Sequence, residues 1–134
     1  MKAFILLATV CASLASVSTQ AESPNSDGAL LFSKHCGACH GSEGQGSDPW
    51  YPNLREASGK HTTHDLAELI LTGQFRRGGD LNGHPIPVMP SWHSLKDREI
   101  AQLVNYIKNT WGDASATTLA PKDVNRLRNS SNNG

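Results

Sequence analysis

Apolar residues recur at helical spacing over 97–111, the longest regular stretch in the chain. These positions follow the i, i+3, i+4, i+7 and i+11 pattern that places side chains on one face of a helix. They are Ile100, Leu103, Val104, Ile107 and Trp111. Gly112 follows directly, and glycine is common just beyond the last residue of a helix. The pattern predicts a helix from about Asp97 to Trp111 with one buried face.

Two shorter stretches predict two more helices. Ser26 can cap a helix over 27–35, which has apolar residues in its middle. Thr62 and Asp65 have the spacing of a capping box, in which each side chain bonds the backbone N–H of the other residue. This box predicts a helix that ends at Gly73.

The segments between these helices, 41–52 and 73–90, are rich in glycine and proline. Loops of this kind normally carry function on a rigid scaffold. Because the regular segments all have helical spacing, we expect an all-α fold whose functional site is bordered by these loops.

The first residues have the organisation of a secretory signal peptide. Lys2 supplies a positive start, residues 4–14 are mostly apolar, and the small residues Thr19 and Ala21 precede a cleavage point after Ala21. The apolar run is shorter than the roughly 20 residues that cross a membrane comfortably. The sequence predicts a signal peptide over 1–21 and export of the remainder. An uncleaved signal that tethers the protein is the alternative.

Charge does not select a partner for this chain. It has 12 basic and 12 acidic side chains and a formal net charge of +0. Neither a polybasic patch nor an acidic tail is present, so nucleic acid is not an expected partner.

Residues 35–40 read His-Cys-Gly-Ala-Cys-His, and Cys-x-x-Cys-His is the attachment signature of a c-type haem. The thiols of Cys36 and Cys39 can add to the two vinyl groups of a haem, and His40 can then reach the iron as an axial ligand. One covalent haem is therefore the predicted cofactor. Two alternatives are a zinc site, which needs a fourth ligand that no second cysteine pair supplies, and a redox dithiol, which belongs in a βαβ unit.

Met89 is the candidate for the second axial ligand. It is the only methionine besides the initiator, and Pro87 and Pro90 restrict the backbone on both sides of it. This restriction suits a loop that must hold one side chain over a metal, so we predict ligation of the iron by Met89. Three alternatives stay open: Met89 as a core filler, His84 or His93 as the ligand, and an open sixth position on the iron.

With these residues in view, 26–112 resembles the class I c-type cytochrome domain of the bacterial periplasmic type. In that family the first helix carries a glycine and, four residues later, an aromatic residue that packs across an aromatic residue of the last helix. Gly28, Phe32 and Tyr106 match these positions. The resemblance implies a domain over 22–112, with three to five helices around one covalently bound haem.

A second match follows the haem motif. The family has a Pro-x-Leu step, here Pro52-Asn53-Leu54, whose proline carbonyl accepts a hydrogen bond from the proximal histidine. Two features depart from the family. Residues 83–87 are richer in proline than the corresponding loop of the family. Lys96 stands where a Ser or Thr often caps the last helix, so we expect Ser94 or Asp97 to cap instead.

The resemblance implies a single-electron carrier rather than an enzyme. With His40 and Met89 both on the iron, no coordination position is left for a substrate. The partners would be redox proteins, a donor dehydrogenase or reductase and an acceptor oxidase or reductase, and the location would be the periplasm. Two alternatives stay open: a haem c subunit of a membrane-associated dehydrogenase or oxidase, and a haem enzyme or sensor with an open distal site in which His84 or His93 acts as acid or base.

Residues 113–134 extend beyond this domain. The pattern from Val124 to Arg128 predicts a short helix, and the polar residues 129–134 are expected to be disordered. For a fixed subunit of a larger redox complex, this extension is a candidate docking segment.

Overall fold

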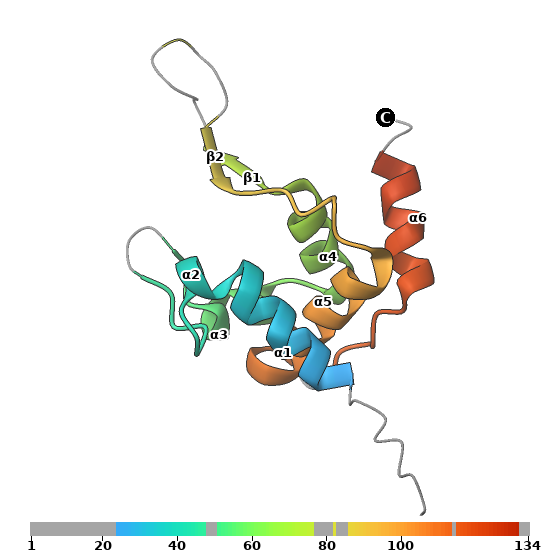
Figure 1. Cartoon of the computed structure of the whole chain (residues 1–134), viewed down its shortest axis with the longest axis horizontal. Helices are drawn as coiled ribbons and strands as arrows, with labels where there is room; N and C mark the ends of the chain where they lie inside the picture. Colours follow the sequence, from blue (N-terminus) through green and yellow to red (C-terminus); the bar gives the residue numbers. More distant parts are fainter. Residues whose placement is uncertain (1–23, 48–50, 77–81, 83–85, 114, 132–134) are drawn as a thin grey trace, which may run out of the picture.

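The computed structural model describes residues 24–47, 51–76, 82, 86–113 and 115–131. The described part is mostly helical, which confirms the predicted all-α class. The predicted signal peptide (1–21) and His84 lie outside the described residues. The elements, in chain order, are α1 (Pro24–His35), α2 (Gly37–His40), α3 (Leu54–Ala57), the 3₁₀ helix η1 (Ser58–Lys60), α4 (Thr63–Thr72), β1 (Gln74–Arg76), β2 (Ile86–Met89), α5 (Asp97–Trp111) and α6 (Pro121–Ser131) (Figure 1).

Helix α1 crosses α5 at very close range. A Cβ atom added at Gly28 would lie 2.5 Å from both the carbonyl oxygen of Gln102 and the Cβ of Tyr106, so only glycine fits at this crossing. One turn further along α1, the ring of Phe32 lies 5.8 Å from that of Tyr106 and 4.8 Å from that of Trp111, measured between centroids. The aromatic pair that the resemblance implied is therefore formed.

The capping box of α4 is confirmed, whereas the start of α1 differs from the prediction. Thr62 Oγ1 accepts a 3.1 Å hydrogen bond from the N–H of Asp65, and Asp65 Oδ2 accepts one of 3.1 Å from the N–H of Thr62. Gly73 ends the helix with a φ of 74°. Helix α1 begins at Pro24, so Ser26 lies in its first turn instead of capping it. Proline is favourable at the first helical position, where a backbone N–H would have no helical partner.

The start of α5 is also capped differently from the expectation. Neither Ser94 nor Asp97 occupies the cap position, because the helix begins directly after Lys96. The carboxylate of Glu99 reaches back and accepts a 2.7 Å hydrogen bond from the N–H of Lys96. This bond satisfies the N–H of Lys96 itself and is the half of a capping box that the third helical residue supplies; the Lys96 side chain has no acceptor for the N–H groups of the first turn.

The glycine- and proline-rich segment after α4 contains a small antiparallel hairpin that the sequence did not predict. Strand β1 pairs with β2, with Gln74 opposite Met89 and Phe75 opposite Pro87. A two-stranded ribbon has a free edge on each strand, so Pro87, which cannot donate a backbone hydrogen bond, is tolerated there. A Cβ at Gly73 would lie 2.6 Å from the carbonyl oxygen of Met89, so this glycine lets the hairpin approach the end of α4.

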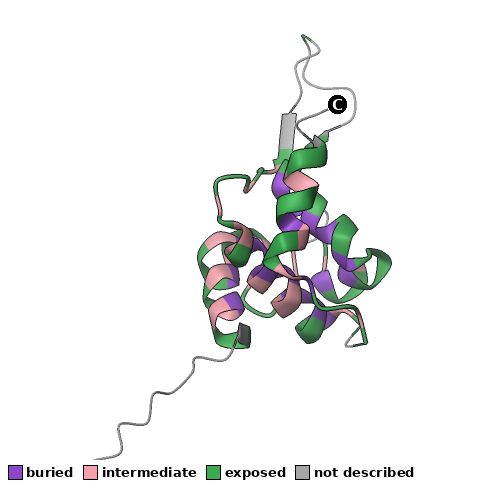
Figure 2. Ribbon diagram, turned by 90° about the vertical axis from the view of Figure 1, so that its right-hand side faces the viewer, coloured by how far each residue is buried: buried purple, intermediate pink, exposed green. Residues whose placement is uncertain are grey.

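The core lies around α5, which packs against α1, α4 and α6. Figure 2 shows the buried residues in purple on these packed helices. Val124 is fully buried and Leu119 is 2% exposed. Helix α6 continues to Ser131, so the expected disorder is wrong for 129–131. The side chains there bond one turn back, as Ser130 Oγ does to the carbonyl of Arg126 at 2.8 Å.

None of the helices in the described part combines the length and the apolar character that a membrane span needs.

Candidate functional site

A cavity of about 390 Å³ is bordered by residues of α2 on one side and of the hairpin of β1 and β2 on another. Its walls come from α1, α2, residues 51–61, α4, the end of β2 and α5. Most of the lining side chains are apolar, among them Phe32, Leu54, Leu66, Ile70, Trp92 and Ile107. A cavity of this composition suits a large apolar ligand that is held by a small number of polar groups.

The two cysteines of the motif line this cavity as free thiols. Helix α1 ends just before Cys36, whose N–H bonds the carbonyl of Phe32 at 2.8 Å, and the chain turns there into α2. Cys36 is buried and Cys39 is exposed. Burial, with a smaller contribution from Cys39, raises the pKa of Cys36 to about 11. The Cys36 sulfur is therefore a neutral thiol at neutral pH.

His40 also lines the cavity, and a backbone carbonyl determines which ring nitrogen is available to a metal. Its Nδ1 lies 3.4 Å from the carbonyl oxygen of Pro52. Because a carbonyl can only accept, this hydrogen bond requires the proton on Nδ1, and in the neutral imidazole Nε2 then carries a free lone pair. The loop between them is folded by two backbone bonds, Gly46 N–H to His40 O at 2.7 Å and Leu54 N–H to Gly44 O at 2.8 Å.

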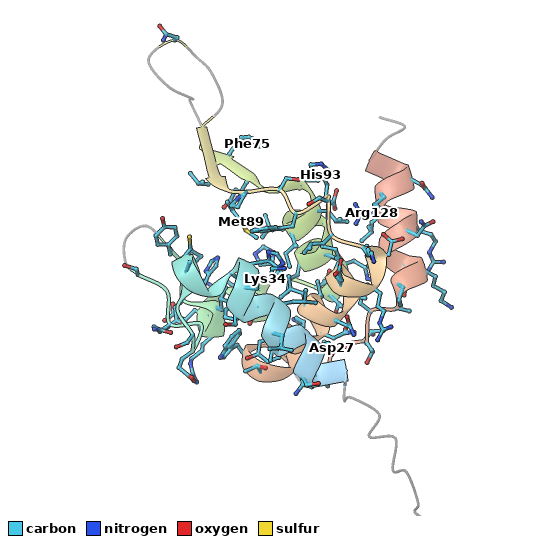
Figure 3. All side chains as sticks on the ribbon, in the orientation of Figure 1. Asp27, Lys34, Phe75, Met89, His93 and Arg128 are labelled. Atoms are coloured by element: carbon cyan, nitrogen blue, oxygen red, sulfur yellow. The ribbon has the colours of Figure 1, made fainter. Side chains whose placement is uncertain are left out.

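Met89 lines the cavity from the hairpin side. Figure 3 shows its side chain extending from the hairpin toward the side where α1 and α2 lie. The segment just after it is attached to α4 by two bonds: Ser91 Oγ donates to the carbonyl of Leu71 at 2.7 Å, and the N–H of Trp92 donates to the carbonyl of Ile70 at 2.9 Å. The structure therefore brings Met89 and His40 to the walls of one cavity.

Of the two histidines considered as alternative ligands, His93 lies within the described residues, and it does not line this cavity. It is exposed, its Nδ1 lies 2.9 Å from Ser91 Oγ, and it is not among the residues that line the walls. His93 therefore does not border the cavity that the haem motif and Met89 share.

Two histidines that the sequence analysis did not assign do line the cavity. The His35 ring contacts the Trp92 ring edge-on at 4.7 Å between centroids. His61 lies at the other end, where its carbonyl oxygen accepts a 2.9 Å hydrogen bond from the ammonium group of buried Lys108. The position of His35 beside the haem motif was a usable signal, whereas no local pattern indicated His61 or Lys108.

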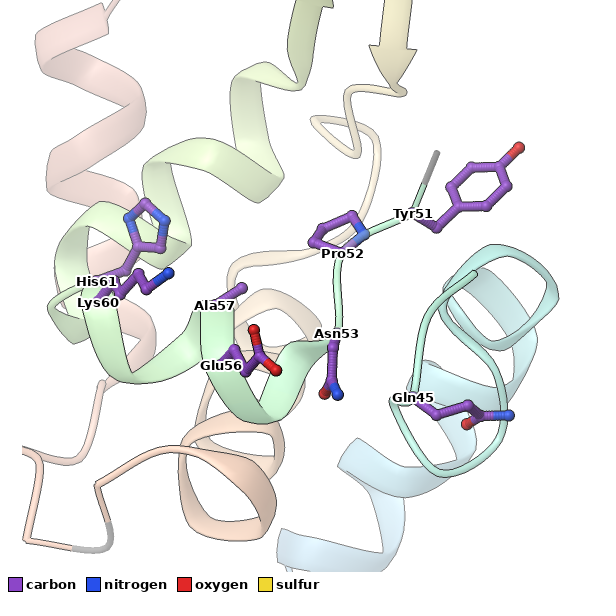
Figure 4. A pocket seen from close by; sticks show the side chains of 8 residues that line it. All are labelled: Gln45, Tyr51, Pro52, Asn53, Glu56, Ala57, Lys60 and His61. Carbon is purple, nitrogen blue, oxygen red and sulfur yellow. The ribbon is translucent and has the colours of Figure 1, made fainter. Parts of the chain in front are cut away.

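A second, more polar pocket of about 510 Å³ adjoins the first and shares Tyr51, Pro52, Ala57 and His61 with it (Figure 4). Lys60 and Glu56 are among its other lining residues. The apolar cavity therefore opens toward a polar border, an arrangement that suits a ligand with an apolar body and charged edge groups.

The residues present fit a covalent haem. Two free thiols, a histidine with an available Nε2 and a thioether sulfur border one apolar cavity. Ser58 also lines the cavity, and its hydroxyl is buried without a hydrogen-bond partner in the described part. For the zinc alternative, the described residues contain no group of three or more His, Cys, Asp or Glu side chains arranged to hold a metal ion.

Comparison with known proteins agrees with this site. The family model for cytochrome c matches residues 26–111. Cytochrome c-552 from Thermus thermophilus is 36% identical over 115 residues, which cover 76% of this chain and 84% of that protein.

Two larger proteins are similar over the same region. The gluconate 2-dehydrogenase cytochrome c subunit of Pantoea cypripedii is 31% identical over 107 residues, which cover 75% of this chain and 24% of that protein. The fructose dehydrogenase cytochrome subunit of Gluconobacter japonicus is 35% identical over 103 residues, which cover 70% of this chain and 20% of that protein. The chain therefore spans no more than about a quarter of the length of these two subunits.

Proposed function

The chain belongs to the cytochrome c family, and from this premise we propose that it is an electron carrier in which residues 22–112 hold one haem c, with His40 and Met89 as the axial ligands of the iron. Bound haem supplies a one-electron Fe(III)/Fe(II) couple. The observation that carries the proposal is the placement of the Cys36, Cys39 and His40 wall and the Met89 wall on the same cavity.

Each proposed role follows from an atom at the cavity. Cys36 and Cys39 would form the two thioether bonds to the haem vinyl groups. The Pro52 carbonyl orients the His40 imidazole and makes it a better donor to the metal. A thioether as the opposite ligand favours the ferrous state and leaves no open position for a substrate.

The border of the cavity supports exchange of electrons with a partner protein. Val88 and Tyr51 both line the cavity and are 47% and 38% exposed, and the nearby strand β1 exposes 55% of Phe75. An exposed apolar border of this kind suits brief association with another redox protein. The predicted signal peptide over 1–21 supports a periplasmic location.

The second candidate is a haem subunit of a membrane-associated dehydrogenase or oxidase. It is favoured by the names of two relatives, the cytochrome subunits of gluconate 2-dehydrogenase and of fructose dehydrogenase. Size-exclusion chromatography of an extract from the native cells separates the two candidates, because a free carrier elutes as a small protein and a subunit elutes with dehydrogenase or oxidase activity.

The optical spectrum of the ferric protein tests the ligand assignment. Methionine ligation gives a weak sulfur-to-iron charge-transfer band in the far red, which we expect in the wild type and not in Met89→Ala. Val88→Ala is the matched control, since it shortens the neighbouring cavity-lining side chain without removing sulfur. A high-spin wild-type spectrum, or carbon monoxide binding by the untreated ferrous protein, would contradict the proposal and indicate an open distal site.

A further inference from the structure

Helix α6 follows the part of the chain that the family model matches, yet its inner face belongs to the protein core. The model match ends at residue 111, and α6 covers Pro121–Ser131. Val124 is fully buried. The side chain of Asn105 on α5 attaches the approach to this helix by two bonds with the backbone of Leu119, at 3.0 and 2.8 Å. This packing does not leave the inner face of α6 free for a docking partner.

Arg128 extends from α6 to the segment that carries Met89 toward α5 (Figure 3). Its Nη1 donates to the carbonyl of His93 at 2.5 Å, its Nη2 donates to the carbonyl of Leu95, and its Nε donates to Asp97 Oδ1 at 2.6 Å. All three nitrogens of the guanidinium group are thus used, and the side chain is only 23% exposed. We call this set of three bonds the Arg128 clamp.

The carboxylate of Asp97, which accepts the bond from Arg128 Nε, is held in its ionised form. A hydrogen bond from Arg128, with a smaller one from Asn125, lowers the pKa of Asp97 below its usual range. Asp97 is therefore ionised at neutral pH, and its bond to the guanidinium group is charge-assisted at both ends.

The clamped segment, residues 91–96, is attached at both ends to rigid elements. Near Met89 it is bonded to α4 through Ser91 and Trp92, and further on it is bonded to α6 through Arg128. Met89 lies two residues before this segment, so displacement of its sulfur from a metal would pull the segment away from the core. Such a movement would strain or break the clamp, so the clamp raises the free energy of the displaced state.

We propose that Arg128 is a positioning residue for Met89: it holds the segment 91–96 against α5 and so keeps the sulfur over the iron. This inference rests on the proposed function, because it requires Met89 to be the axial ligand. The residues after 111 then act within the haem domain rather than as a separate docking segment.

The test is displacement of Met89 by imidazole in the ferric full-length protein with its haem, followed through loss of the far-red charge-transfer band. The apparent affinity for an added ligand depends on the fraction of molecules in which the sulfur has left the iron. For Arg128→Met, which keeps the apolar stem of the side chain, we expect imidazole to bind about tenfold more tightly because three charge-assisted bonds are lost.

Arg126→Met is the matched control. It removes one positive charge from the same helix, but the Arg126 side chain is 72% exposed and its ion pair is with Asp123 on α6 itself. We expect its imidazole affinity to equal that of the wild type. Arg128→Lys retains the charge without the three-nitrogen fork, so it should lie between Arg128→Met and the wild type; it also serves as the test variant if Arg128→Met does not fold.

The outcomes separate the two proposals. A wild type without the far-red band would refute Met89 ligation and, with it, the basis of this inference. A wild type with the band, together with Arg128 variants that bind imidazole no more tightly than Arg126→Met, would leave the proposed function intact and overturn the role of Arg128.

Discussion

The crossing of α1 and α5 gives the sharpest prediction for stability. In Gly28→Ala the new methyl group would meet the Gln102 carbonyl oxygen and the Tyr106 Cβ, both at 2.5 Å. Because ordinary contacts between carbon atoms are about 3.5–4.0 Å, the two helices would have to separate by roughly 1 Å. Both obstructing atoms belong to the backbone or are attached directly to it, so no side-chain rotation can relieve the contact.

The net cost follows from two opposing effects. Overpacking costs about 1–3 kcal/mol, and the rigid obstruction places this site near 3 kcal/mol. Replacing a helical glycine by alanine returns about 1 kcal/mol of helix propensity. We therefore expect the free energy of unfolding to fall by about 2 kcal/mol. The separation should also loosen the contacts of Phe32 with Tyr106 and Trp111, next to Cys36.

Guanidinium unfolding of the haem-loaded protein, followed by far-ultraviolet circular dichroism, measures this change. Gly59→Ala is the control, because a Cβ at Gly59 meets nothing within 4 Å. Its midpoint should stay close to that of the wild type. If Gly28→Ala is as stable as Gly59→Ala, the close contact between the helices is not a constraint and the reasoning is wrong.

Two further predictions concern the border of the cavity and the start of α4. Lys108→Met removes the donor that bonds the Ser58 and His61 carbonyls at 3.0 and 2.9 Å. Since an unsatisfied buried acceptor costs about 1–3 kcal/mol, the free energy of unfolding should fall by about 2–4 kcal/mol. An unchanged midpoint in guanidinium unfolding would contradict this prediction. Hydrogen bonds from the side chain and then the backbone of Thr62 lower the pKa of Asp65 in the folded protein. The stabilisation from this carboxylate is therefore complete above its pKa in the unfolded chain, about 4, and is lost as the pH falls through its pKa in the folded protein. In thermal unfolding, the difference in stability between the wild type and Asp65→Asn should therefore shrink from pH 7 to pH 2. A difference that stays constant over this range would rule out the linkage.

The sequence was most informative where the relevant contacts span a few residues. The Thr62 and Asp65 capping box and the apolar face of α5 were predictable because their partners lie within one or two helical turns along the chain. The helix starts were less predictable, because Ser26 and Pro24 are both acceptable at a helix N-terminus and the local pattern does not select between them.

The hairpin could not be predicted for a related reason. Its register joins Gln74 to Met89 across a segment that has no alternating pattern, and strands with three and four residues carry too little periodicity to be recognised. For the same reason the approach of Gly73 to the Met89 carbonyl was not foreseen, although Gly73 was correctly expected to end α4.

The sequence by itself determined the chemistry of this protein and the main helices. The haem attachment motif is complete within residues 36–40, and only one methionine besides the initiator is available to act as a ligand. The contact between His40 and the Pro52 carbonyl was expected from the family resemblance. Tertiary structure alone decided the buried ammonium of Lys108 and the Arg128 clamp on the segment after Met89. These contacts join residues that are 31 to 50 positions apart in the chain. Such partners are selected by how the helices pack against one another, which no local pattern of residues encodes.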